Sequence, residues 1–208
     1  MSVAAALACC STPVAQPRVA VIGDSITALA QPDLTAVLGP SYDPDYTFRI
    51  GVRIDQLLGL VAVDVHEYGT PAAAVVNVGT NDAIEGGTSA HTLATFDQLL
   101  ALLGPTRCVV LTTIGPFADL RGGSDAGAAL NARIFALAEA DPRRIKVVDW
   151  NGFVLSLDTT ARQTYVQHDL IHETPAGARW IAASDRTALA TCGRSVQAPM
   201  LPAPAPAS

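Results

Sequence analysis

The sequence is poor in several features that mark particular classes of protein. Lys146 is the only lysine among 208 residues, 15% of the residues are charged, and the net charge is −6. No cluster of Lys and Arg stands out, so the basic surface typical of nucleic-acid binding is absent. No run approaches the roughly 18 apolar residues that a membrane-spanning helix needs. We therefore expect a small-molecule substrate, no nucleic-acid partner and no transmembrane segment. The oligomeric state is open, with a monomer favoured.

Cysteine is also scarce, and its spacing excludes the common metal sites. The four cysteines are an adjacent pair, Cys9 and Cys10, and two distant single residues, Cys108 and Cys192. None of these spacings is typical of a zinc site, so no metal is expected. Cys108 begins an apolar run and Cys192 ends the last helical pattern. They form either a disulfide or two buried free thiols, and both alternatives stay open.

The two ends differ in composition from the rest of the chain. Residues 1–16 are predicted to be an N-terminal arm or the remnant of a signal, although a basic start is missing. Cys9 follows a segment with a weak resemblance to a bacterial lipoprotein cleavage site. Residues 196–208 are rich in Pro and Ala and are predicted to be a linker-like tail. The ends favour a bacterial secreted or cell-envelope location over the cytoplasm, and residues 17–195 are predicted to be one domain.

Within that domain, short β-branched runs alternate with longer amphipathic segments. Strands are predicted at residues 18–23, 46–50, 73–78, 107–113 and 144–149. Helices are predicted up to about residue 38 and at about 53–63, 90–103, 125–139 and 175–190. Continuous apolar strands that alternate with helices indicate an α/β fold, in which a parallel sheet is covered on both faces. In such a sheet, ligands bind beyond the carboxyl ends of the strands.

Ser25 follows the first predicted strand and begins a helix. Gly23 allows a sharp turn, and the N-terminus of the helix offers free N–H groups to an anion. A serine in this place can act as a nucleophile whose own N–H stabilises the oxyanion. The alternative is that Asp24 or Ser25 only caps the helix.

Two further strand ends carry candidate oxyanion donors. Asn81 follows the third strand, and its amide can donate without carrying a charge. An Asx turn is the alternative for this position. Gly51 follows the second strand and can leave its backbone N–H open to a substrate, although it can also be an ordinary turn glycine. Arg53 is interpreted as a solvated side chain at the start of a helix rather than a group that faces substrate.

The candidate base lies near the C-terminus. Thr174 and Pro175 are predicted to cap and begin the last helix, which leaves His172 in the loop before it. Asp169, three residues earlier, can turn back and orient the imidazole. The alternative is an exposed ion pair. His66 and His91 are interpreted as surface residues.

Taken together, these segments resemble the SGNH, or GDSL, hydrolase family. The resemblance covers residues 17–190 and rests on three blocks, Gly23-Asp24-Ser25, Gly79-Thr80-Asn81-Asp82 and Asp169-Leu170-Ile171-His172. The residues around Gly51 depart from the family's pattern. The resemblance implies a three-layer α/β/α sandwich with a five-stranded parallel sheet in the flavodoxin-like order 2-1-3-4-5. It also implies a nucleophile at Ser25, a base at His172, an orienting acid at Asp169, and an oxyanion hole of Ser25, Gly51 and Asn81.

The function expected from this resemblance is hydrolysis of small or exposed acyl esters through a Ser acyl-enzyme, without metal or cofactor. The alternatives are an O-acyltransferase, a carbohydrate O-acetyl esterase and a non-catalytic binding module of the cell envelope. Aromatic residues make up only 5% of the chain, which argues weakly against a groove that stacks on sugars.

Overall fold

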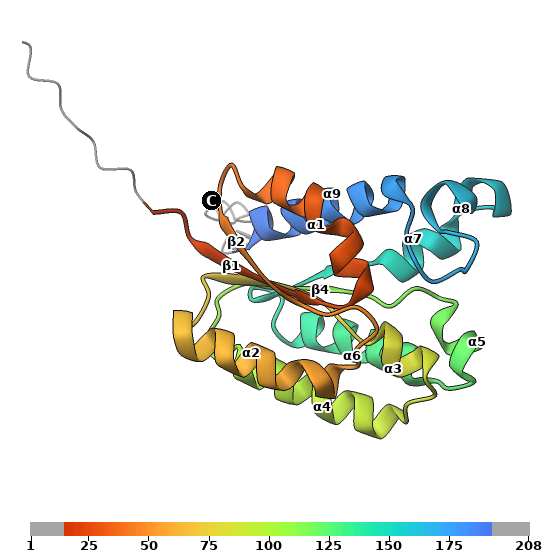
Figure 1. Cartoon of the computed structure of the whole chain (residues 1–208), viewed down its shortest axis with the longest axis horizontal. Coiled ribbons are helices and arrows are strands. Elements are labelled where there is room, and N and C mark those ends of the chain that lie inside the picture. Colours follow the sequence, from red (N-terminus) through yellow and green to blue (C-terminus); the bar gives the residue numbers. More distant parts are fainter. Residues whose placement is uncertain (1–14, 193–208) are drawn as a thin grey trace, which may run out of the picture.

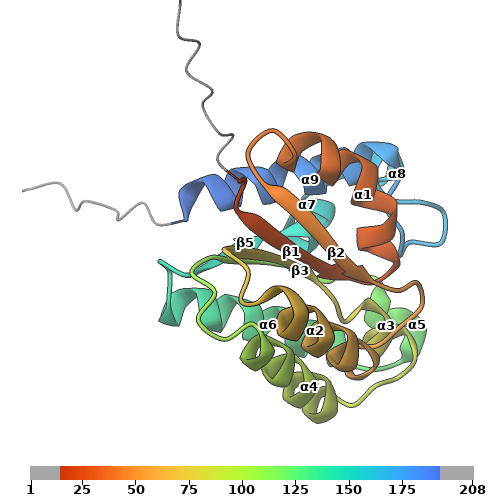
Figure 2. The same cartoon turned by 60° about the vertical axis from the view of Figure 1, so that its left-hand side comes forward.

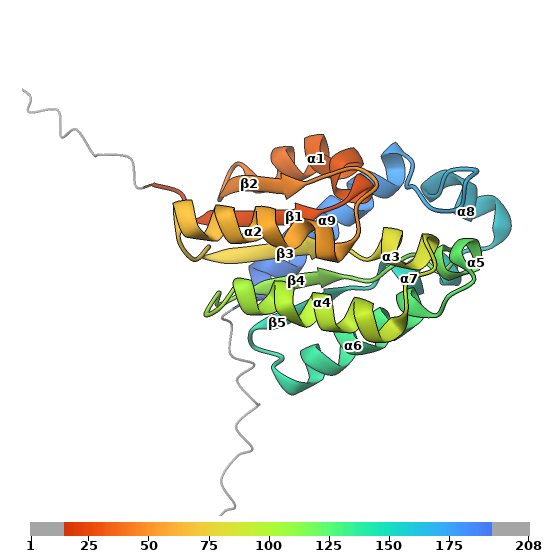
Figure 3. The same cartoon turned by 60° about the horizontal axis from the view of Figure 1, so that its bottom comes forward.

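Five parallel strands form the centre of the fold. The computed structural model describes residues 15–192, so Cys9 and the predicted tail lie outside the described residues. The strands are β1 (Arg18–Gly23), β2 (Asp43–Phe48), β3 (Ala73–Asn77), β4 (Val109–Thr112) and β5 (Ile145–Val148). They lie in the order β2-β1-β3-β4-β5, and all neighbours are parallel (Figure 3). The predicted sheet and its flavodoxin-like order are confirmed.

Five long helices cover the two faces of this sheet (Figures 1 and 2). One face carries α1 (Ser25–Leu38) and α9 (Pro175–Thr191), and the other carries α2 (Ile54–Tyr68), α4 (Ser89–Leu102) and α6 (Ala126–Ala140). Alternate residues of β1 point to opposite faces, as a strand requires. Val19 and Val21 pack with α1 and α9, whereas Ala20 and Ile22 pack with α2, α4 and α6. The predicted three-layer sandwich follows from this two-sided burial.

Four short helices lie toward the end of the molecule where the strands finish (Figure 1). They are α3 (Thr80–Ile84), α5 (Ala118–Gly122), α7 (Trp150–Ser156) and α8 (Thr159–Tyr165). None of them was predicted, because five to seven residues are too few for a helical period to be visible.

The second strand begins earlier than predicted and ends earlier as well. It starts at Asp43, and its register pairs Arg18 with Asp43 and Gly23 with Phe48. β2 is an edge strand, where Pro44 is tolerated, so its first half lacks the apolar pattern of the central strands. The following helix, α2, continues to Tyr68, five residues beyond the predicted end.

Cys108 and Cys192 are joined by a disulfide, which resolves the two alternatives for these cysteines. The bond links the segment before β4 to the end of α9, at the edge of the sheet opposite to the carboxyl ends of the strands. Between residues 15 and 192, no helix is both long enough and apolar enough to cross a bilayer.

Candidate active site

Ser25 is held in a tight turn between β1 and α1. A Cβ at Gly23 would lie 1.8 Å from Thr27 Oγ1 and 2.8 Å from the carbonyl oxygen of Asn77, so only glycine fits there. Asp24 is the N-cap of α1, and its Oδ1 accepts a hydrogen bond from the N–H of Ile26 at 3.0 Å. Because Asp24 caps the helix, the hydroxyl of Ser25 is left for another partner.

That partner is His172, which the fold brings to Ser25 from 147 residues away. His172 Nε2 lies 3.0 Å from Ser25 Oγ, and His172 Nδ1 lies 2.6 Å from Asp169 Oδ2. When the proton is on Nδ1 and bonded to Asp169, Nε2 can accept the hydroxyl proton of Ser25. The three predicted residues therefore form one continuous chain of hydrogen bonds.

The segment 166–174 carries both Asp169 and His172 and closes on itself. Val166 and Glu173 form an antiparallel bridge, and the N–H of Gln167 donates to the carbonyl of His172 at 2.8 Å. At the end of the segment, Thr174 caps α9 and Pro175 is its first residue, as predicted. Arg121 of α5 also donates to the carbonyl of Asp169. These bonds close the backbone of the segment and join it to α5 and α9.

Asp169 is held in its charged form by the groups around it. Its burial acts to raise the pKa, but hydrogen bonds from His172 and from the N–H groups of Ile171 and His172 outweigh burial and lower it. The side chains of Asp169 and His172 are 42% and 33% exposed. A carboxylate in this position stabilises an imidazolium, and a substrate can reach the pair from solvent.

Asn81 lies on α3, directly beside the turn that holds Ser25. Its Nδ2 donates to the carbonyl of Val52 at 3.0 Å and to Asp24 Oδ2 at 3.3 Å. The position is helical, in place of the Asx turn that was the alternative. The bond to Val52 commits one amide hydrogen. The other makes only the longer contact to Asp24, so it is the less committed of the two donors.

Gly51 lies one residue before Val52, whose carbonyl accepts the hydrogen bond from Asn81. Its φ of +71° is in the left-handed region, and a Cβ there would meet no atom within 4 Å. Glycine is therefore favoured by the backbone conformation, not by crowding. The residue is exposed and lies in the same loop as the Asn81 contact.

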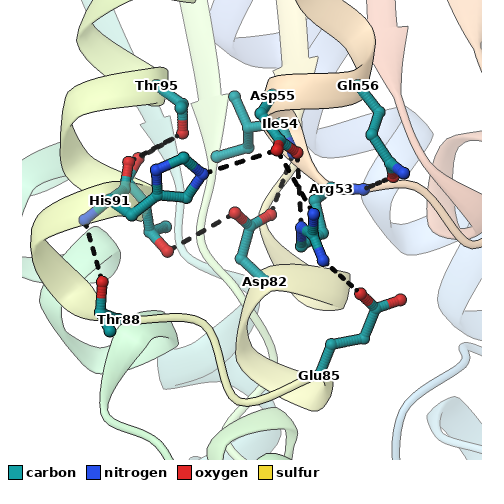
Figure 4. A network of polar contacts seen from close by, with 10 residues as sticks. Arg53, Ile54, Asp55, Gln56, Asp82, Glu85, Thr88, His91 and Thr95 are labelled. Carbon is teal, nitrogen blue, oxygen red and sulfur yellow. Dashed lines mark hydrogen bonds and ion pairs between the residues drawn. The ribbon is translucent and has the colours of Figure 1, made fainter.

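A polar network fastens this loop to α3 and α4 (Figure 4). Arg53 pairs with Asp55 at 3.3 Å and with Glu85 at 2.9 Å, so its guanidinium is occupied by carboxylates and is not simply solvated. Buried Asp82 accepts the N–H of Ile54 at 3.1 Å. These contacts join the loop of Gly51 to the helix that carries Asn81.

The two histidines that were interpreted as surface residues lie on the surface. His66 and His91 are exposed, and His91 Nε2 lies 3.5 Å from Asp55 Oδ2. Trp150 is buried in an aromatic cluster, 5.5 Å from the Trp180 ring.

Two further carboxyl groups, Asp24 and Glu173, lie buried close to the proposed triad, and no local sequence pattern indicates their burial. Burial raises the pKa of Asp24 to about 7 and the pKa of Glu173 to about 8. Asp24 is hydrogen-bonded, as described above. Neither carboxylate oxygen of Glu173 has a partner among the described residues. The position of Glu173 directly after His172 was the only sequence signal.

Comparisons with known proteins agree with this architecture. The sequence model of the GDSL-like lipase/acylhydrolase family matches residues 21–180. No curated protein matches the chain. A solved lipase/acylhydrolase from Enterococcus faecalis is 16% identical with a TM-score of 0.69, covering 83% of this chain and 94% of its own.

Two other solved structures share the fold. The C-terminal catalytic domain of peptidoglycan O-acetyltransferase A from Streptococcus pneumoniae is 19% identical with a TM-score of 0.65, covering 86% of this chain and 95% of its own. A family 3 carbohydrate esterase from Clostridium thermocellum is 16% identical with a TM-score of 0.63, covering 84% of this chain and 96% of its own.

Proposed function

The chain belongs to the GDSL-like lipase/acylhydrolase family, and we propose that it is a serine esterase with Ser25 as nucleophile, His172 as base and Asp169 as orienting acid. The observation that carries this proposal is the pair of short contacts that His172 makes, 3.0 Å to Ser25 Oγ and 2.6 Å to Asp169 Oδ2. A base within hydrogen-bond reach of a hydroxyl, itself oriented by a third group, is the arrangement that activates a weak nucleophile.

The proposed reaction proceeds through an acyl-enzyme. Ser25 Oγ attacks the ester carbonyl carbon while His172 Nε2 takes the hydroxyl proton. The C–O bond to the alcohol then breaks, and the alcohol leaves with the proton from His172. Water repeats the sequence on the acyl-enzyme, which releases the acid and restores Ser25. Asp169 stays ionised throughout and stabilises the imidazolium.

We further propose that the oxyanion is held by the N–H groups of Ser25 and Gly51 and by the amide of Asn81. The N–H of Ser25 lies at the start of α1, where the helix leaves its donors unpaired. Gly51 and Asn81 belong to two elements that the bond from Asn81 to Val52 holds together. Donors fixed before the reaction stabilise developing charge without reorganisation.

The substrate class that fits this site is a small or exposed acyl ester. The acid and base of the proposed triad are partly open to solvent, so a deeply enclosed acyl chain is not required. Exposed apolar residues lie in the surrounding segments, with Ile50 beside Gly51, Leu120 beside Arg121, and Leu170 beside Asp169. They offer the substrate a short apolar contact at the rim.

Labelling with a fluorophosphonate probe tests the nucleophile directly. We expect one adduct on the full chain, mapped to Ser25 by peptide mass, and none on Ser25→Ala. A folded wild-type protein without an adduct would reject the esterase and favour the non-catalytic binding module.

A panel of p-nitrophenyl esters of increasing chain length then tests the substrate class. We expect the highest kcat/KM with short acyl chains. Adding a sugar or alcohol acceptor to the same assay separates hydrolysis from transfer. Release of free acid that is unchanged by the acceptor supports the esterase, and preferential acylation of the acceptor supports the O-acyltransferase.

A further inference from the structure

We propose that Glu173 is a positioning residue for His172 that works only while its carboxyl group is protonated. Ionisation of this group would drive it out of its pocket and loosen the segment 166–174, which carries both Asp169 and His172. The activity consequence rests on the proposed esterase function, whereas the structural consequence does not.

The backbone leaves the Glu173 side chain little freedom to reach solvent. Glu173 is only 2% exposed. It forms the antiparallel bridge with Val166, and its carbonyl accepts the side-chain amide of Gln167 at 2.8 Å. Because the residue is fixed on both sides of its backbone, the carboxyl group stays buried as long as the segment is closed.

The surroundings of Glu173 are close-packed and offer no hydrogen bond to its carboxyl group. A Cβ built at Gly177 would lie 2.7 Å from the Cβ of Glu173 and 3.1 Å from Trp150. Trp150 and Val166 belong to a buried apolar cluster between α1, α7 and α9. Within residues 15–192, neither carboxyl oxygen finds a partner. A charge in such a place is strongly unfavourable, so burial favours the neutral form of the group.

The charged groups near Glu173 oppose its ionisation as well. Asp24 at the start of α1 and Asp169 in the segment itself both act on it, and both are acids. Trp150 of α7 and Gly177 of α9 carry no charge. Arg162 of α8 lies over the Phe117 ring and donates to the carbonyl of Leu157. Its buried Nε has no partner, and neither carboxyl oxygen of Glu173 bonds to it in the described part of the chain.

The direction of the pH effect follows from these contacts. Burial, with Asp24 and Asp169 adding to it, raises the pKa of Glu173 from an ordinary 4.5 to about 8. Below pH 4.5 the group is protonated in both the folded and the unfolded chain. Between 4.5 and 8 only the unfolded chain loses the proton, so stability falls as the pH rises. Above 8 the folded chain ionises too, and local opening of the segment relieves the buried charge.

The test compares wild type with Glu173→Gln, which keeps the shape of the side chain but cannot ionise. With p-nitrophenyl acetate as probe, we expect the wild-type kcat to fall about tenfold or more from pH 8 to pH 9.5, as a group that must stay protonated requires. The kcat of Glu173→Gln should keep its plateau over the same range. Glu173→Met serves as a second non-ionising variant if the glutamine variant does not fold.

Asp185 of α9 provides a matched control. It is also a fully buried acid, and burial raises its pKa to about 8, but its partner is Thr112 of β4 and it lies outside the segment 166–174. Asp185→Asn should raise the melting temperature more at pH 9 than at pH 5 while leaving the alkaline fall in kcat as in wild type. An equal change in the pH profile from Asp185→Asn would overturn a specific role of Glu173.

A readout without activity separates this proposal from the esterase assignment. We expect hydrogen exchange of peptides from 166–174 to be faster in wild type than in Glu173→Gln at pH 9, and equal in the two proteins at pH 4, where the carboxyl group is protonated in the open segment as well. Equal exchange at both pH values, or superimposable kcat profiles, would overturn the positioning role. If the exchange differs but no ester is hydrolysed, the positioning role stands and the esterase proposal fails.

Discussion

The two sides of the proposed site, an oxyanion side with Gly51 and Asn81 and a base side with Asp169 and His172, are held by different kinds of interaction. On the oxyanion side, the loop of Gly51 is tied to α3 and its C-cap by side chains: Arg53 pairs with Glu85, and the buried Asp82 accepts the N–H of Ile54 (Figure 4). On the base side, the segment 166–174 is closed by backbone hydrogen bonds, and its buried acid, Glu173, has no partner among the described residues.

The two sides also differ in backbone strain, which is greater on the base side. Each side has a residue with a left-handed conformation, with φ of +71° at Gly51 and +63° at Leu170. Glycine adopts this conformation without cost, whereas leucine is strained by its Cβ. The oxyanion side therefore has its left-handed position filled by glycine, whereas the base side holds a strained leucine and an unpaired buried acid. We expect the base side to be the one that responds to pH and to local opening.

The largest expected effect comes from breaking the base side at His172. His172→Ala should lower kcat by a factor on the order of 10⁴–10⁶, because members of a triad act as a unit. For the same reason, adding Ser25→Ala to it should cause almost no further loss. Steady-state kinetics of the single and double variants check this, with circular dichroism as the folding control. Losses that multiply in the double variant would mean that the two residues act independently.

A smaller loss is expected from the oxyanion side. Asn81→Ala removes one donor to the proposed oxyanion and should lower kcat by about 10²–10³ with little change in KM. The pH profile should keep its shape, because the base side is intact. A kcat within a factor of two of wild type would remove Asn81 from the oxyanion hole and leave it only its structural bond to Val52.

The network beneath the oxyanion loop should have a smaller effect on rate and a clear effect on stability. Asp82→Ala leaves the buried N–H of Ile54 without its acceptor, which costs about 1–3 kcal/mol of unfolding free energy. Thr92→Val is the milder control, because it removes only the 3.5 Å contact to Asp82. Urea denaturation measures the loss.

The kinetics of Asp82→Ala and Thr92→Val decide whether the network around Asp82 positions the oxyanion donors. We expect Asp82→Ala to lower kcat by about tenfold, less than Asn81→Ala, because the donor is displaced and not deleted. Wild-type kcat in a destabilised Asp82→Ala protein would show that the network supports the fold alone.

Most of the fold could be predicted from periodicity, and the errors have physical causes. Central strands such as Arg18–Gly23 are buried on both faces, so their apolar runs mark them clearly. β2 is half-buried at the edge of the sheet, where the alternation is weak, and its predicted start was three residues late. The short helices at the strand ends carry no period of their own.

Most residues of the proposed site could also be predicted, because they belong to short sequence motifs that follow the strands. What the sequence could not give is the state of each group. The pairing of Arg53 with Glu85 joins residues 32 positions apart, and nothing local indicates it. No local pattern indicates the burial of Glu173, because this burial depends on how α7 and α9 meet. The partners of a side chain are set by the tertiary fold, whereas the identity of a motif is set locally.

The smallest predicted effect tests the strain on the base side. Leu170 is exposed, so replacing it removes little packing. Leu170→Asn should be more stable than Leu170→Ala by about 0.5–1 kcal/mol, because asparagine adopts the left-handed conformation more readily than alanine. Urea denaturation of both variants measures the difference, and the alanine variant controls for loss of the side chain. Hydrogen exchange in the segment 166–174 should be slower in Leu170→Asn than in Leu170→Ala. Exchange around Gly51 should be the same in the two variants. Equal stability of the two variants would mean that the base side stores no strain at Leu170. The unpaired acid Glu173 would then be the remaining difference between the base side and the oxyanion side.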